Sequence, residues 1–304
     1  MQRMTIGGAF GAMIDFIRTS WLVILGTLLA AGVITGLLGF AAIGSTMETF
    51  ANQTPGAAPP DPAQAMQAFS RLWLVFLGAG VLFYAASFLS WRHGLTGGSE
   101  SVFANIGWAV GASLTSMLTM LVVGIVLIIA LYAIIAVVAL IFIAVFGLSG
   151  AGVGDLMSPA ASAGLGAGVI ASVILFYILF FVGFYWVYGR FSAAGPVMAV
   201  QRTVNPITGL SESWRLTKSS QWVIVGFFLL QLLLSFVALI VISVVGGGAA
   251  ALMNPAQPPA AMGIVPIVLM IVVYVPLILM SIATPPAIYR QVAGADAVAD
   301  DVFA

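Results

Sequence analysis

Cysteine is absent from this chain, and histidine occurs only once, as His93. Without cysteine there can be no disulfide, no thiolate nucleophile and no cysteine ligand for a metal ion. A single histidine cannot form a histidine metal cluster either. The sequence therefore predicts a protein with no metal site and no bound cofactor.

Charged side chains are almost as scarce. They make up 6% of the 304 residues, against roughly 25% in a soluble domain. Nine basic residues balance nine acidic ones, so the net charge gives no reason to expect nucleic acid as a partner. Residues 219–289 contain no charged side chain at all. A charge at the centre of a membrane helix costs about 2.5–3.5 kcal/mol, so long uncharged stretches are typical of a chain embedded in lipid.

Hydrophobic residues make up 62% of the chain and gather in runs long enough to cross a bilayer as helices. Helices are expected because backbone amides in lipid need partners within their own segment. A closed β-barrel would show alternating polarity, and runs such as 121–135 do not alternate. We therefore expect an all-α integral membrane protein, with six transmembrane helices in a single membrane domain over residues 1–304. The runs fall at about 21–44, 71–91, 114–147, 166–189, 221–246 and 264–289.

Six spans divide the connecting segments into two sets on opposite sides of the membrane. One set holds eight of the nine basic residues, and the other holds only Arg71. Basic residues beside spans favour the cytoplasmic side, so both termini are predicted to be cytoplasmic. The eight residues are Arg3, Arg18, Arg92, Arg190, Arg202, Arg215, Lys218 and Arg290.

Short amphipathic stretches precede the first, third and fifth spans. Each places apolar residues at helical spacing, as a helix does when it lies in the headgroup boundary. The third has a clear start, with Asn205 as N-cap and Pro206 at the first helical position. We expect three amphipathic interfacial helices that form a cytoplasmic collar. Their apolar residues are Ile6, Phe10, Met13, Ile14 and Ile17, then Val102, Phe103, Ile106 and Val110, then Ile207, Leu210 and Trp214.

These stretches also resemble one another in sequence, because Ser99-Glu100-Ser101 recurs as Ser211-Glu212-Ser213. The pattern indicates a threefold internal repeat of interfacial helix, span, outer linker and return span. Basic residues near an anionic bilayer surface are attracted to lipid phosphates. The expected headgroup contacts are Arg18, Arg202, Arg215 and Lys218.

One region resembles a known family. Gly189-Arg190-Phe191, Pro196 and the segment from Gly209 to Lys218, which leads into Trp222, are similar to the membrane domains of glycerophosphoryl diester phosphodiesterases. Related multi-span bacterial inner-membrane proteins of uncharacterised function share the pattern. The resemblance covers about residues 185–240 and implies a helical module in a bacterial inner membrane. This sequence has no His/Glu/Asp set to hydrolyse a phosphodiester, so the resemblance implies no enzyme activity.

Two local patterns offer alternatives. Gly147-Leu148-Ser149-Gly150 matches the motif of an intramembrane serine protease, but the predicted topology places His93 on the opposite side of the membrane from that serine. Prolines in the sixth span and polar groups near it allow a small cavity, of the kind that discontinuous helices form in transporters. The cavity residues would be Gln231, Ser235 and Tyr274.

The sequence thus favours a non-enzymatic membrane protein, a structural or partner- and lipid-binding module. The alternative is a transporter or lipid-handling protein with a cavity near Gln231 and the proline-containing sixth span. Membrane lipids are the expected partners, and a protein partner or a homo-oligomer remains open. No nucleic acid is expected.

Overall fold

A computed structural model describes residues 4–51, 62–142, 177–178, 180–252 and 259–294. Regular structure in these ranges is helical throughout, without a strand, so the all-α prediction is confirmed. The chain divides into two compact units. Unit 1 comprises Met1–Ser116 and Gly189–Ala304, and unit 2 comprises Met117–Tyr188.

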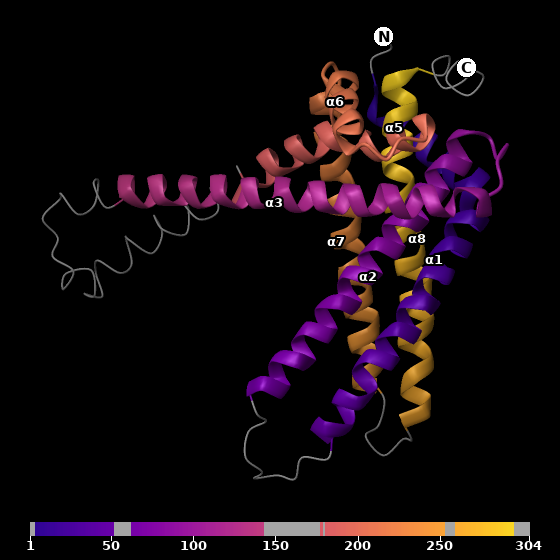
Figure 1. Ribbon diagram of the computed structural model, residues 1–304, viewed down its shortest axis with the longest axis vertical. Coiled ribbons are helices and arrows are strands. Elements are labelled where there is room, and N and C mark those ends of the chain that lie inside the picture. The colour runs from indigo at the N-terminus through magenta and orange to yellow at the C-terminus, as the bar shows by residue number, and fades with distance from the viewer. Residues whose placement is uncertain (1–3, 52–61, 143–176, 179, 253–258, 295–304) are drawn as a thin grey trace, which may run out of the picture. The chain divides into compact units, whose positions relative to one another are not determined.

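The long helices are α1 (Ile6–Ala51), α2 (Pro62–Leu95), α3 (Ile106–Phe142), α7 (Gln221–Leu252) and α8 (Pro259–Ala293). Two shorter helices, α5 (Ala194–Gln201) and α6 (Pro206–Thr217), lie between residue 193 and α7 (Figure 1). A 3-10 turn, η1 (Phe103–Asn105), leads into α3. Residues 180–191 are also helical.

Five helices in the described ranges are long and apolar enough to cross a membrane. They coincide with the first, second, third, fifth and sixth predicted spans, which is the pattern of a multi-pass membrane protein. The expected fourth span, 166–189, lies outside the described residues up to position 176 and is helical from position 180 onward.

The predicted interfacial helices differ in how they join the spans. The first stretch continues into its span without a break, as the beginning of α1. The second passes through η1 directly into α3. Only the third, α6, is a separate helix, because the chain turns at Lys218–Ser220 before α7 begins. Its predicted N-cap is present, since the Asn205 side chain accepts a hydrogen bond from the Ile207 amide at 3.0 Å.

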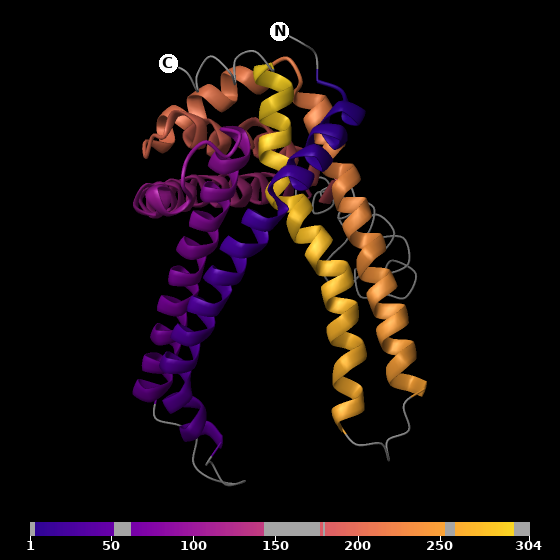
Figure 2. The ribbon, with the colours of Figure 1, turned by 90° about the vertical axis from the view of Figure 1, so that its right-hand side faces the viewer.

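Within unit 1, α1 packs along α2 and α8, and α7 packs along α8. Figure 2 shows the α1–α2 pair and the α7–α8 pair meeting at the end where α5 and α6 lie. We call this end the hub: α1 and α7 begin there, and α2 and α8 end there. In unit 2, aromatic rings stack along the helical residues 180–188, with Phe184 on Tyr188 at 6.1 Å.

Buried side chains concentrate in the hub. The face of α1 that packs there carries Ala9, Phe16 and Ser20. Of the predicted apolar face, Met13 is buried, whereas Ile6 and Ile14 are exposed. Small residues let helix backbones approach closely, which stabilises helix contacts in lipid more than large apolar side chains do. Away from the hub, large apolar side chains such as Phe40 and Phe76 are exposed, as lipid contact requires.

A proline in α8 is accommodated by a side chain from α2. Pro286 has no amide hydrogen, so the Ile282 carbonyl loses its usual donor four residues ahead. The Trp91 indole Nε1 donates to that carbonyl at 2.7 Å. Trp91 reaches it past Gly195 of α5, where a Cβ atom would come within 2.2 Å of the indole ring. This contact ties α2, α5 and α8 together.

Candidate functional site

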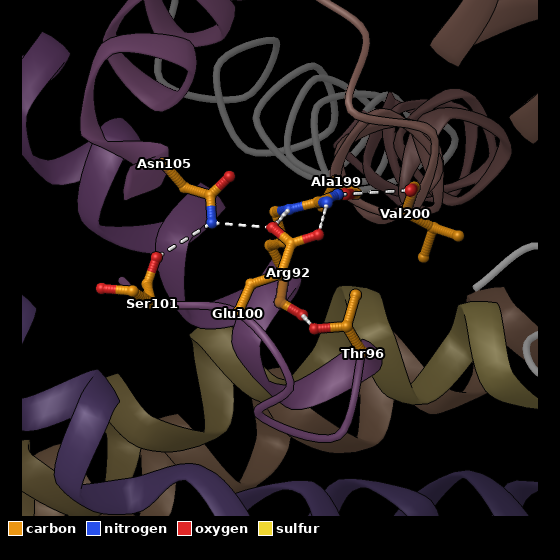
Figure 3. A network of polar contacts seen from close by, with 7 residues as sticks. All are labelled: Arg92, Thr96, Glu100, Ser101, Asn105, Ala199 and Val200. Carbon is orange, nitrogen blue, oxygen red and sulfur yellow. Dashed lines mark hydrogen bonds and ion pairs between the residues drawn. The ribbon is translucent and has the colours of Figure 1, made fainter. Parts of the chain in front are cut away.

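The most extensive polar network in the hub is centred on Arg92, near the end of α2 (Figure 3). Arg92 is 6% exposed. Its Nη1 donates to the carbonyls of Ala199 at 2.7 Å and Val200 at 3.3 Å. These carbonyls belong to the last turn of α5, where no helical amide follows to bond them. Arg92 therefore caps the carboxyl end of α5 with hydrogen bonds and positive charge.

The other side of the Arg92 guanidinium bonds Glu100, in the loop before η1. Arg92 Nε and Nη2 donate to the two carboxylate oxygens, the former at 2.9 Å. Asn105 Nδ2 also donates to Glu100, at 2.9 Å, and to the Ser101 carbonyl at 3.1 Å. The hydrogen bond from Arg92, followed by that from Asn105, lowers the pKa of the Glu100 carboxyl below its ordinary value. Glu100 is thus held as a carboxylate that fixes the loop.

A second buried arginine, Arg190, contacts α6. Its guanidinium lies over the Trp214 ring, 4.2 Å from the centroid, and Nη1 donates to the Trp214 carbonyl at 3.2 Å. The Arg190 carbonyl in turn accepts from Ser213 Oγ at 2.7 Å and Thr217 Oγ1 at 3.3 Å. Both the backbone and the side chain of Arg190 therefore hold α6 in place.

The third arginine, Arg290, lies near the end of α8. Its Nη1 donates to Asp15 at 3.1 Å, and Nη2 donates to the Gly94 carbonyl at 2.8 Å. The guanidinium also lies 5.4 Å from the centroid of the Phe16 ring. Arg290 thus joins α8 to α1 and α2.

The three arginines share one geometry. Each lies near the end of a helix that returns to the hub, and each bonds a carbonyl in the last turn of another helix: α5, α6 or α2. Each also lies over an aromatic ring, with Arg92 5.8 Å from the Trp108 centroid. The three aromatics, Phe16, Trp108 and Trp214, come from the stretches that precede the first, third and fifth predicted spans.

The sequence marked these arginines as indicators of topology, and Arg190 also as part of the family motif, but it did not reveal their capping role. The signal that could have pointed to it is their spacing, since each follows a return span and they lie about one hundred residues apart. The carbonyl partners of Arg92 and Arg290 are distant in sequence, 107 and 196 positions away, whereas that of Arg190 is 24 positions away.

The four predicted headgroup residues, in contrast, are all exposed. Arg18 lies on α1, Arg202 follows α5, Arg215 lies in the last turn of α6, and Lys218 follows α6. Arg215 also forms an ion pair with Glu212 on its own helix, and the hydrogen bond from Arg215 lowers the pKa of Glu212. The structure thus separates exposed basic residues from the three that cap helices.

Helix α6 packs through Gly209, Ser213, Leu216 and Thr217 and leaves its predicted apolar face partly exposed, with Leu210 half-buried. Gly209 and Ser213 are buried against the segment that holds α5. A Cβ atom at Gly209 would come 2.7 Å from Met198 Cγ and 2.9 Å from the Ala194 carbonyl oxygen. Ile207 and Trp214, from the predicted apolar face, are 71% and 39% exposed.

The three predicted cavity residues do not meet at one point. Gln231 Nε2 donates to Thr284 Oγ1 on α8 and to the Met13 sulfur at 3.4 Å. Ser235 Oγ donates to the Gln231 carbonyl, within α7. Tyr274 lies ten residues before Thr284 on α8, roughly 15 Å away along the helix axis.

Within the described ranges, no group of three or more His, Asp or Glu side chains is arranged to hold a metal ion. Comparisons with protein-family models, curated proteins and solved structures give no match to this chain.

Proposed function

We propose that this protein is a non-enzymatic membrane module whose hub lies at the cytoplasmic surface and binds anionic lipid. The observation that supports this most directly is the orientation of α6. Its small residues pack inward, while Ile207 and Arg215 are exposed and Trp214, whose ring also contacts Arg190, is 39% exposed. A helix with exposed apolar and basic residues is suited to the headgroup boundary.

The proposed topology has six spans in a bacterial inner membrane, with both termini cytoplasmic. All three capping arginines and the four exposed basic residues then belong to the same side, as the positive-inside rule favours. The recurring arginine–aromatic contacts also support a threefold repeat, in which each return span is tied to the interfacial stretch of the next unit and the last to the first.

We further propose kinship with the membrane domains of glycerophosphoryl diester phosphodiesterases. The residues that carry this resemblance contact one another: Arg190 stacks on Trp214, and Ser213 and Thr217 bond the Arg190 carbonyl. The physical role of the shared motif is then to hold α6 against the hub.

A transporter or lipid-handling role with a cavity near Gln231, Ser235 and Tyr274 is the second candidate. It has less support, because the Gln231 amide already donates to Thr284 and Met13. A protein partner or a second copy of the chain could also bind the exposed face of α6, and the experiment below distinguishes these occupants.

The test uses the full chain in nanodiscs that contain phosphatidylglycerol and phosphatidylcholine. Glutamine replaces one exposed basic residue at a time, at Arg18, Arg202, Arg215 or Lys218. Each variant is then extracted from the nanodiscs into detergent, and the lipids that stay bound to it are quantified by native mass spectrometry. Each basic residue near an anionic surface contributes about 1 kcal/mol, so each variant should retain phosphatidylglycerol about fivefold less well. Arg71→Gln, the same change in the other set of connections, is the matched control.

Equal retention in all five variants would contradict the lipid-binding role. A co-purified protein, or a dimer mass that persists in every variant, would favour a protein partner or a homo-oligomer instead.

A further inference from the structure

Arg202 has an unusual backbone conformation. In the part of the chain that the structure describes, it is the only residue other than glycine with a positive φ, at φ 51° and ψ 35°. Helices often end with a residue in this left-handed conformation, usually glycine or asparagine. For a residue with a Cβ atom the conformation is unfavourable. Such residues cluster at functional sites, where the surrounding structure holds them in place.

The backbone around Arg202 accounts for the conformation without its side chain. The amides of Arg202 and Thr203 both donate to the Met198 carbonyl, the latter at 3.1 Å. The Trp108 indole donates to the Thr203 carbonyl at 3.2 Å, and Thr203 Oγ1 accepts from the Asn205 amide at 3.1 Å. Glycine at position 202 could form the same backbone bonds with less strain.

The usual structural task of a basic residue at this point is already performed by another residue. A cation at a helix carboxyl end commonly bonds the last carbonyls and stabilises the helix dipole. At α5 this is done by Arg92, which bonds the Ala199 and Val200 carbonyls. Arg202 itself is exposed and bonds none of these carbonyls. Its charge contributes only the last and smallest of the effects that lower the pKa of Glu100, so its guanidinium remains available for a ligand.

We propose that Arg202 binds the phosphate group of an anionic ligand, an inference that rests on the lipid-binding role proposed above. A guanidinium can donate two parallel hydrogen bonds to phosphate oxygens, which a lysine ammonium cannot match. Arg202 lies just before the N-cap of α6, so the phosphate would lie beside the start of that exposed amphipathic helix. A lipid headgroup and free inorganic phosphate share this chemistry.

The test compares Arg202→Gly with the unchanged protein in nanodiscs of phosphatidylglycerol and phosphatidylcholine. Relief of the left-handed strain should raise the thermal unfolding midpoint by about 2 °C. Loss of the guanidinium should reduce phosphatidylglycerol retention about fivefold. Arg202→Asn should show the same pair of changes, because asparagine tolerates this φ. Arg202→Lys should keep the midpoint and lose part of the retention.

A lower midpoint in Arg202→Gly would show that the side chain supports the fold, and full lipid retention would show that it binds no phosphate; either result overturns the inference. Arg215→Gln and Lys218→Gln separate this outcome from failure of the lipid role. If they lose lipid and Arg202→Gly does not, only the Arg202 inference fails. If none loses lipid, both fail.

A second measurement identifies the source of the bound phosphate group. Inorganic phosphate is added at millimolar concentration: release of lipid points to free phosphate as the ligand, and unchanged lipid retention points to a lipid headgroup.

Discussion

At the residue scale, the hub depends on side chains that satisfy backbone carbonyls at helix ends. Glu100 takes part indirectly, because its carboxylate orients the Arg92 guanidinium toward α5. Since the pKa of Glu100 is lowered in the folded protein, the carboxylate stabilises the fold above its ordinary pKa. That contribution is lost as the pH falls through the lower, folded value.

Glu100→Gln should therefore unfold at a lower temperature than the unchanged protein at pH 7. We expect a loss of about 1 kcal/mol or less, because the Glu100 side chain is 40% exposed and screened by solvent. The two proteins should converge as the pH falls through the lowered folded pKa of Glu100, where both lack the charge. Tryptophan fluorescence during heating in detergent measures this. Glu212→Gln, which affects an ion pair within α6, is the control and should change less. A difference that persists in acid would contradict the assignment.

Gln231 and Thr284 form an asymmetric pair. Thr284 Oγ1 also donates to the Met280 carbonyl at 2.7 Å, so Gln231→Leu leaves Thr284 with a partner. We expect the free energy of unfolding to stay within about 0.6 kcal/mol of that of the unchanged protein.

The reverse change has a larger effect. Thr284→Val leaves the Gln231 amide without its oxygen acceptor and should lower the free energy of unfolding by about 1 kcal/mol or more. Unfolding midpoints in detergent measure both. A stable Gln231→Leu protein that has lost a co-purifying lipid would instead favour the transporter hypothesis.

At the scale of elements, the sequence predicted where helices occur better than which faces pack. Length and hydropathy locate a span because lipid imposes them locally. Packing in the hub combines small residues such as Ala9 and Gly209 with large ones such as Phe16. In a chain with 34 glycines and 62% hydrophobic residues, neither kind singles out a face. The start of α6 was predictable from Asn205-Pro206, whereas neither the turn at Lys218–Ser220 nor the continuous start of α1 has a comparable signal.

Gly209→Leu should detach α6, because even a Cβ atom would be too close to Met198 and to the Ala194 carbonyl. Overpacking of this kind typically costs about 1–3 kcal/mol. Ser213→Cys, placed in this cysteine-free chain, reports the change, since Ser213 is fully buried. A maleimide should label this cysteine slowly in the single variant Ser213→Cys. It should label it rapidly in the double variant that also carries Gly209→Leu. Thr208→Leu, at an exposed position one residue earlier, should leave labelling slow. Rapid labelling of the single variant Ser213→Cys as well as of the double variant with Gly209→Leu would show that α6 is not docked.

At the scale of the whole molecule, charge asymmetry is the strongest sequence signal, and it predicts the side on which the hub lies. Single cysteines at Ala57, Ser158 and Ala256 should react with an impermeant thiol reagent added outside intact cells. Cysteines at Ser99 and Thr208 should react only after the inner face is opened. The reverse pattern would place the hub outside and contradict the proposed collar.

The candidate site was only half predictable at this scale. Topology alone places all eight basic residues on one side, but it does not separate the four exposed ones from the three that cap helices. The capping role was predictable at most from the regular spacing of the arginines, since two of the three bind carbonyls that only the folded chain brings near; Arg290 and Gly94 are 196 positions apart. Local pattern carries no information about such pairs.

The bond between Trp91 and the Ile282 carbonyl has a consequence for sequence variation among relatives. Phenylalanine at position 91 would fill much of the same volume but would leave that carbonyl without a donor for as long as position 286 is proline. Any other residue at 286 restores the helical amide and removes the need for an indole. Among natural relatives, tryptophan at 91 should therefore vary freely only where the proline at 286 has already been replaced.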